Sequence, residues 1–120
     1  MTKLTEKHCV PCEGGTPPLD EATTTLLLGE VRGWRKLAEQ GKDLGARITK
    51  QLKFRDFVAA MAFLDKMAVI AEAEQHHPDF CVHYNQVDVT LWTHAVGGLS
   101  ENDFILAAKV DVLVEPGGTP

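Results

Sequence analysis

A long helical pattern from Asp56 to Gln75 constrains the fold most strongly, because no glycine or proline interrupts it. Pro78 follows closely and pushes the residue before it, His77, toward an extended backbone, so the helix must end there. Asp56 stands at the start, where a negative charge suits the helix dipole. Apolar residues recur at steps of three and four, the spacing of one helix face. The pattern predicts a core face made of Phe57, Met61, Leu64, Ala68 and Ala71, widened by Val58 and Met67.

Two pairs of strand-like segments flank this helix. Before it, residues 34–38 and 46–54 are separated by a turn over residues 40–45. After it, residues 80–85 and 87–93 meet at Asn85 and Gln86, which we expect to form a tight turn. Alternate residues of a strand point to opposite faces of a sheet. In the last segment one face then holds Val87, Val89 and Leu91, and the other holds Asp88, Thr90, Trp92 and His94.

Two shorter helices are predicted at the ends of this series. The first covers residues 19–31, with Asp20 as its N-cap. The second starts at Ser100, where the run to Asp103 resembles a capping box with Asp in place of Glu or Gln. The order of helix, hairpin, helix, hairpin and helix predicts an α+β fold, a four-stranded antiparallel sheet with three helices packed on one face. The other sheet face and the edge strands would stay open, which favours self-association.

Length and composition fit one domain, since 120 residues with 44% hydrophobic content can bury a core. We expect an irregular N-terminal arm over residues 1–18, one domain over 19–115 and a C-terminal tail over 116–120. The chain has 12 basic and 17 acidic residues and a net charge of -5, without a basic run, which argues against direct nucleic-acid binding. No segment resembles a membrane span or a secretory signal, so we expect a cytoplasmic protein.

Four of the five histidines lie between Glu72 and Asp103, and three of them, His76, His77 and His94, are candidates for chemistry. They can be polar residues at the ends of elements, where a cationic imidazole suits a helix C-terminus. They can also be ligands of zinc or iron together with Glu72 or Asp103. Against a metal, adjacent side chains on an extended backbone point to opposite sides, so His76 and His77 rarely reach one ion.

A second candidate for a metal is the Cys9-x-x-Cys12 pair, with His8 beside it. A structural zinc site needs about four ligands, usually as two such pairs. The third cysteine, Cys81, stands alone in a strand pattern. We therefore interpret the N-terminal pair as two reduced thiols.

Acid/base catalysis without a metal is the remaining interpretation of the histidines. A protonated imidazole can donate to a leaving group while a neutral one accepts a proton, and each such transfer contributes on the order of a hundred to ten thousand fold. The chain has no nucleophile elbow, phosphate loop or dinucleotide fingerprint, which leaves proton transfer as the natural chemistry. The residues by themselves indicate no substrate.

The same stretch resembles the pterin-4a-carbinolamine dehydratase family. The pattern of that family is an acidic residue, then His-His-Pro, an aromatic residue, a later His and an Asp. This chain supplies the pattern at the family's spacing with Glu72, His76, His77, Pro78, Tyr84, His94 and Asp103. The likeness extends over about residues 19–113, and the leader from Cys9 to Leu19 is similar to that of bacterial members.

The resemblance implies that the protein removes water from a 4a-hydroxytetrahydropterin to give quinonoid dihydropterin, in pterin recycling after aromatic amino-acid hydroxylation. The implied catalytic residues are His76, His77 and His94. His76 and His94 would be the acid/base pair, without an assignment of which is acid and which is base. His77 would bind the pterin and stabilise the developing positive charge. Other positions would orient the histidines or bind the ring, namely Glu72, Asp103, Pro78, Phe80, Trp92 and Thr93.

The family also implies a homodimer or homotetramer, with no metal and no organic cofactor. Phe80 stands where many members have Trp, and Trp92 where a small residue is common, so we expect altered stacking and a narrower pocket. An alternative function follows from relatives that act as dimerisation cofactors of a transcription factor. On that interpretation the chain is a coactivator-type binding module that keeps the pocket.

Overall fold

The structure is a computed structural model that describes residues 3–11, 17–38 and 46–114. Cys12, the turn predicted over residues 40–45 and the tail predicted over 116–120 lie outside the described residues. The elements in chain order are η1 (Leu4–Glu6), α1 (Glu21–Leu28), β1 (Arg35–Ala38), β2 (Ala46–Lys53), α2 (Phe57–Glu74), β3 (Asp79–His83), β4 (Gln86–Leu91), η2 (His94–Val96) and α3 (Glu101–Val114).

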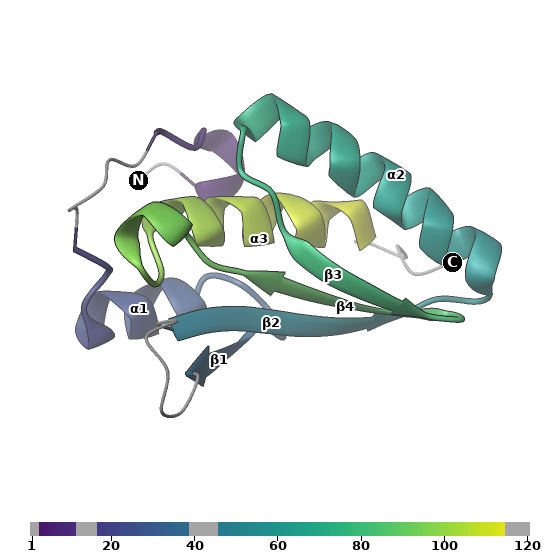
Figure 1. Ribbon diagram of the computed structural model, residues 1–120, viewed down its shortest axis with the longest axis horizontal. Coiled ribbons are helices and arrows are strands. Elements are labelled where there is room, and N and C mark those ends of the chain that lie inside the picture. Colours follow the sequence, from purple (N-terminus) through teal and green to yellow (C-terminus); the bar gives the residue numbers. More distant parts are fainter. Residues whose placement is uncertain (1–2, 12–16, 39–45, 115–120) are drawn as a thin grey trace.

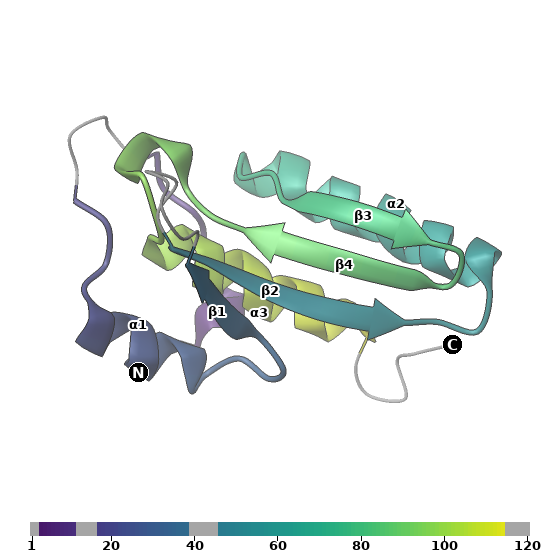
Figure 2. The same cartoon turned by 60° about the horizontal axis from the view of Figure 1, so that its bottom comes forward.

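The four strands form one sheet in the order β1-β2-β4-β3, and every neighbouring pair is antiparallel. Helices α2 and α3 lie over one face of this sheet (Figure 1), and α1 packs against α3. Figure 2 shows the other sheet face with no helix over it. The α+β fold predicted from the sequence is confirmed.

The apolar side of β4 forms the centre of the core. Val87, Val89 and Leu91 are each 0% exposed, as their alternation predicts. The helices cover them with large buried side chains, among them Phe63, Met67, Phe104 and Leu106. One polar pair interrupts this core: Lys50 of β2 reaches Asp111 of α3 at 2.8 Å, which explains why a lysine stands in the apolar stripe of β2.

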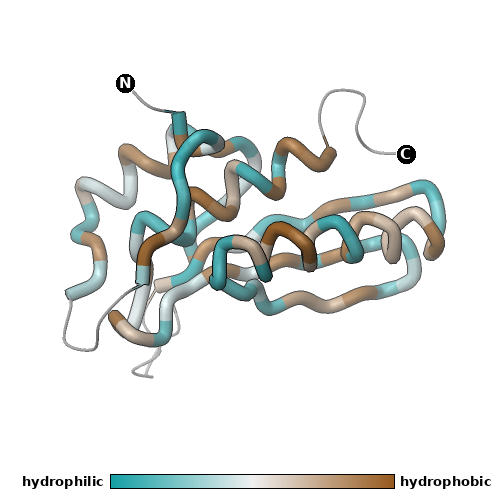
Figure 3. Tube along the Cα trace, turned by 90° about the horizontal axis from the view of Figure 1, so that it is seen from above, coloured by the Kyte–Doolittle hydropathy of each residue, from teal (hydrophilic) through white to brown (hydrophobic). Residues whose placement is uncertain are grey.

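Local signals set the ends of α2, but its predicted core face is partly wrong. Asp56 caps the helix and accepts a hydrogen bond from the Ala59 backbone at 2.9 Å. Phe57 and Met61, which we expected in the core, are 48% and 39% exposed. Apolar and polar residues are mixed along the tube of α2 (Figure 3), so the sequence does not single out one face. The buried positions are Ala59, Ala60, Phe63, Leu64, Met67 and Ala71. They differ from the predicted face because α2 packs against both α3 and the sheet.

The second hairpin turns one residue earlier than predicted. His83 pairs with Gln86, so Tyr84 and Asn85 form the loop. Tyr84 has a positive φ of 54°, the conformation that the first loop residue of a type II′ turn requires. Asn85 is held in the turn because its amide donates to the Phe54 carbonyl at 3.0 Å and its own carbonyl accepts from the Phe54 backbone at 2.7 Å.

Strand β4 also ends earlier than predicted, at Leu91. Thr93 forms an isolated bridge with Gly98, and the residues between them make the single turn η2. Gly97 supports this reversal with a φ of 68°, in the left-handed region that favours glycine. His94 therefore starts a turn and is not part of a strand face, which corrects the expectation from the alternation.

Candidate active site

The end of α2 sets the direction of His76. Gln75 leaves the helix in the left-handed conformation, with φ 55° and ψ 39°. The His76 backbone then donates to the Ala71 carbonyl at 3.2 Å, the six-to-one bond of a Schellman-type helix end. Pro78 keeps the chain extended beyond this point. The two adjacent histidines consequently point to different sides, as the sequence indicated.

His76 is held by a buried carboxylate. Its Nε2 lies 2.6 Å from Oδ1 of Asp103, and the side chains are 11% and 0% exposed. The other Asp103 oxygen accepts from the Thr93 hydroxyl at 2.8 Å and from the Ser100 backbone at 2.9 Å. An ionised carboxylate only accepts hydrogen bonds. Nε2 of His76 therefore carries the shared proton, and Nδ1 is left as the proton acceptor of a neutral ring.

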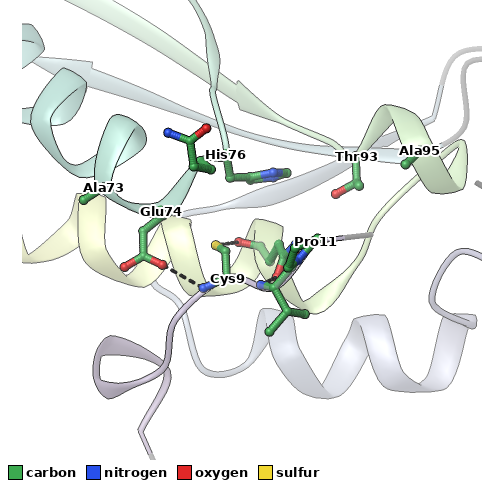
Figure 4. Close-up of a pocket in the computed structure, with 10 residues that line it drawn as sticks. Cys9, Pro11, Ala73, Glu74, His76, Thr93 and Ala95 are labelled. Atoms are coloured by element: carbon green, nitrogen blue, oxygen red, sulfur yellow. Dashed lines mark hydrogen bonds between the residues drawn. The ribbon is translucent and has the colours of Figure 1, made fainter. Parts of the chain in front are cut away.

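A cavity of about 410 Å³ lies beside His76. Three parts of the chain surround it: the end of α2 with His76, the loop with Thr93 and Ala95, and the N-terminal arm against the start of α3. Figure 4 shows His76 on one side of the cavity, with Cys9 and Pro11 opposite. A pocket of a few hundred cubic ångströms with a few convergent polar groups is typical of a small-molecule site.

His77 belongs to a different surface. Its Nε2 lies 2.6 Å from Oε2 of Glu72, and both side chains are more than half exposed. A mainly apolar cavity of about 260 Å³ is lined by His77, Glu72, Pro78 and Phe80 together with α2 residues. Phe80 itself is half exposed at the edge strand β3.

The His94 ring lies against Trp92, with ring centroids 3.8 Å apart and the two planes tilted by 42°. The indole N–H donates to Asp79 at 3.1 Å, and the Arg47 guanidinium lies 4.1 Å from the centre of the Trp92 ring. His94 is exposed, but its neighbours Thr93 and Ala95 both line the cavity beside His76. His94 itself is not among the residues that line this cavity.

The predicted site residues thus fall into three groups. His76, Asp103 and Thr93 form the first at the large cavity, His77 with Glu72, Pro78 and Phe80 forms the second, and Trp92 with His94 forms the third. Tyr84 lies at the hairpin tip, at the opposite end of β4 from Thr93. The large cavity is also lined by Cys9, Val10, Glu74 and Asn102. These residues could not be placed at the site from the sequence, because their position there depends on how the arm docks.

Metal ligation has little support among the described residues. Residues 3–11, 17–38 and 46–114 contain no group of three His, Cys, Asp or Glu side chains placed to hold an ion. Burial, followed by the negative charges of Glu74 and Asp103, raises the pKa of Cys9 to about 12. Its thiol is therefore protonated at neutral pH. Within the same ranges no helix is long and apolar enough to cross a membrane.

The sequence matches a family model described as pterin 4 alpha carbinolamine dehydratase over residues 17–113. The chain belongs to this family. A relative in Rickettsia canadensis is 45% identical over 92% of this chain and 97% of its own length. One in Nitrosospira multiformis is 45% identical over 93% of each chain. Both names assign the dehydratase activity provisionally.

Solved structures of the pterin dehydratase fold agree with this membership. A Brucella melitensis protein described as a transcriptional coactivator/pterin dehydratase has a TM-score of 0.72 and 36% identity, over 80% of this chain and 97% of its own. A pterin dehydratase-like protein described as a RuBisCO assembly factor of the alpha-carboxysome has a TM-score of 0.56 and 28% identity, over 70% and 92%. The family is therefore associated with more than one role.

Proposed function

We propose that this protein is a pterin-4a-carbinolamine dehydratase that acts by histidine acid/base catalysis. The observation that carries the proposal is the buried Asp103–His76 pair at the wall of a cavity of about 410 Å³. In the reaction the C4a–O bond of a 4a-hydroxytetrahydropterin breaks and the oxygen leaves as water. The N5–H electron pair becomes the N5=C4a double bond of the quinonoid dihydropterin.

His76 is the proposed base that removes the N5 proton. Its Nδ1 is the free acceptor because Nε2 is bonded to Asp103. When Nδ1 takes the proton, the ring becomes an imidazolium, and the adjacent carboxylate stabilises that charge. Thr93 and the Ser100 backbone hold the carboxylate in place, so Asp103 acts as a positioning residue.

His94 is the proposed acid that protonates the 4a-hydroxyl. Its neighbours in sequence, Thr93 and Ala95, line the cavity, and its own exposed side chain can regain a proton from water after each turnover. The contact with Trp92 supports one side of its ring. His77 is oriented by Glu72 and lines the second cavity with Pro78 and Phe80, so its role in binding the pterin stays a prediction.

Single substitutions test the two roles. We expect His76→Ala and His94→Ala to lower kcat by about a hundredfold or more, the usual contribution of one positioned proton-transfer group. The measurement is the rate of carbinolamine dehydration by purified protein treated with a chelator. His83→Ala is the matched control, since His83 is an exposed histidine on β3 outside the three groups, and it should retain the full rate. Full activity in both active-site variants would refute the assignment, and loss of activity on chelation would favour a metal.

A binding module is the second candidate function. The two solved relatives are described as a transcriptional coactivator and as an assembly factor. This chain also exposes large apolar side chains on α2 and β3, including Phe57, Val58, Met61, Val69 and Phe80. A protein that folds and binds pterin but leaves the dehydration rate unchanged would favour this alternative.

The biological setting we propose is a cytoplasmic homodimer or homotetramer that recycles the pterin of an aromatic amino-acid hydroxylase. The open sheet edges at β1 and β3 support self-association. The net charge of -5 supports a small-molecule substrate over a nucleic acid. The molar mass in solution, measured by light scattering, tests the oligomer against the 13.2 kDa of one chain.

A further inference from the structure

The N-terminal arm contributes to the large cavity although it lies outside the family match. That match begins at residue 17, yet Cys9, Val10 and Pro11 line the cavity beside His76. The Brucella melitensis protein is covered over 97% of its chain while matching only 80% of this one. Part of the cavity wall therefore lies before the residues that the family model matches.

The arm is docked on the core at its first turn. Leu4 of η1 is only 5% exposed and belongs to the hydrophobic core. Lys109 of α3 donates to the Thr5 carbonyl at 3.1 Å, and Lys7 pairs with Glu101 at 2.7 Å. These contacts hold the beginning of the arm along α3, from where the chain runs to the cavity.

Two further anchors hold the arm at the cavity itself. The Cys9 backbone donates to Glu74 at 2.7 Å. Val10 and the Asn102 side chain form a reciprocal pair, in which the Val10 backbone donates at 3.0 Å and its carbonyl accepts at 2.6 Å. Glu74 lies two residues before His76, and Asn102 directly precedes Asp103. The arm is thus tied to the neighbours of both members of the His76–Asp103 pair.

The arm contributes a neutral, polarisable surface to the cavity, whereas the wall opposite is polar. Val10 and Pro11 present aliphatic groups, and Cys9 presents a thiol that stays neutral because of its raised pKa of about 12. Figure 4 shows this side facing His76 across the cavity. A neutral, polarisable surface opposite a polar one suits a flat heteroaromatic ring, whose face is apolar and whose edge carries the hydrogen-bonding groups.

We propose that residues Cys9–Pro11 form a substrate-recognition wall that holds the pterin ring against His76. This inference rests on the proposed function, because it assigns the pterin to the same cavity. The wall acts on binding and not on proton transfer, since none of its groups can exchange a proton near neutral pH. Weakening it should therefore raise KM and leave kcat nearly unchanged.

Hydrogen exchange of the wild-type protein tests the wall directly. The ligand is a 7,8-dihydropterin, which lacks the 4a-hydroxyl and cannot be dehydrated. We expect saturating ligand to slow the exchange of the Cys9 and Val10 amides about tenfold or more, because closing the wall over a ligand suppresses local opening. Amides of α1, which do not line the cavity, should change by less than about twofold. Equal exchange of the arm with and without bound ligand overturns the inference.

Kinetics of Asn102→Ala provide the second test. The substitution removes both bonds to Val10, and we expect KM to rise about tenfold with kcat within about twofold. Asn85→Ala is the matched control, since Asn85 also bonds a backbone carbonyl but at the far hairpin tip, and its KM should be unchanged. An unchanged KM in Asn102→Ala overturns the wall alone. A wild type that neither binds the dihydropterin nor dehydrates the carbinolamine overturns both the wall and the proposed function.

Discussion

Asp103 joins the stability of the fold to the chemistry of the site. It is the third residue of α3 and is fully buried. One oxygen bonds His76, and the other accepts from Thr93 and from the Ser100 backbone at the start of α3. The last of these is half of the capping box that the sequence predicted. The Ser100 hydroxyl does not complete the box and bonds the Thr93 hydroxyl at 2.8 Å instead.

Asp103→Asn should damage both stability and catalysis. The amide nitrogen must face a donor, which leaves a buried polar group without its partner and costs about 1–3 kcal/mol. It also removes the charge that stabilises the His76 imidazolium, so we expect kcat to fall about a hundredfold. Urea unfolding and dehydration kinetics measure the two effects. Asp88→Asn, at a partly exposed position on the open face of β4, is the control, and a full kcat in Asp103→Asn would contradict the positioning role.

At the scale of single elements, the end of α2 contains a conformation that its sequence does not favour. Gln75 adopts a left-handed backbone with φ 55°, which costs a residue with a Cβ roughly 1–2 kcal/mol. Most helices that end this way have glycine at this position. The glutamine compensates in part with a side-chain bond to the Glu72 carbonyl at 2.8 Å.

Gln75→Gly should therefore stabilise the protein by about 0.5–1 kcal/mol. Glycine removes the strain of the left-handed backbone, and the larger conformational entropy that it loses on folding offsets part of this gain. Gln75→Val should destabilise it by more than about 1 kcal/mol, because a β-branched residue fits this region poorly. Urea unfolding of the pair measures both changes. If Gln75→Gly and Gln75→Val were equally stable, backbone strain at Gln75 would not determine how stable this helix end is.

The sequence predicts those parts of the elements that depend on nearby residues. Local signals include the cap Asp20, the helix start at Asp56, the exit before Pro78 and the alternation of β4, and all of them appear in the structure. The buried face of α2 was predicted poorly because apolar residues surround that helix, and tertiary packing selects the alanines at 59 and 60. The hairpin shifts by one residue because Asn85 bonds Phe54, which is distant in sequence.

The difference between local signals and contacts distant in sequence also applies to the site. The pairing of His76 with Asp103 spans 27 positions, and the family spacing was the only indication of it in the sequence. We expected Asp103 to lie at the start of the last helix, close to the segment that holds His94. Its hydrogen bond with Thr93 agrees with this expectation. The arm contacts could not be predicted, since Glu74 and Asn102 are 65 and 92 residues from their partners in the arm.

At the scale of the whole molecule, Glu74 connects three parts of the chain. It is a residue of α2, it accepts from the Cys9 backbone and lies 2.9 Å from His8 of the arm, and Lys109 of α3 lies 3.4 Å away. Burial alone raises the pKa of Glu74, but the bonds from Cys9 and His8 and the charge of Lys109 outweigh it. The pKa of Glu74 is therefore lowered below its ordinary value of 4.5.

The lowered pKa of Glu74 predicts that acid releases the arm. A carboxyl whose pKa is lower in the folded state stabilises that state at pH values above its unfolded pKa, and the contribution disappears as the pH falls through the lowered folded value. We expect the protection factors of the Cys9 and Val10 amides, which correct for the intrinsic pH dependence of exchange, to be constant from pH 7 to about 5 and to fall below about pH 4.5. Glu74→Gln should weaken protection at pH 7 and flatten this profile, because the amide has no charge to lose. Glu21→Gln, at an exposed position in the first turn of α1, should retain the wild-type profile. A Glu74→Gln protein with the same acid release as wild type would mean that another group controls how the arm docks.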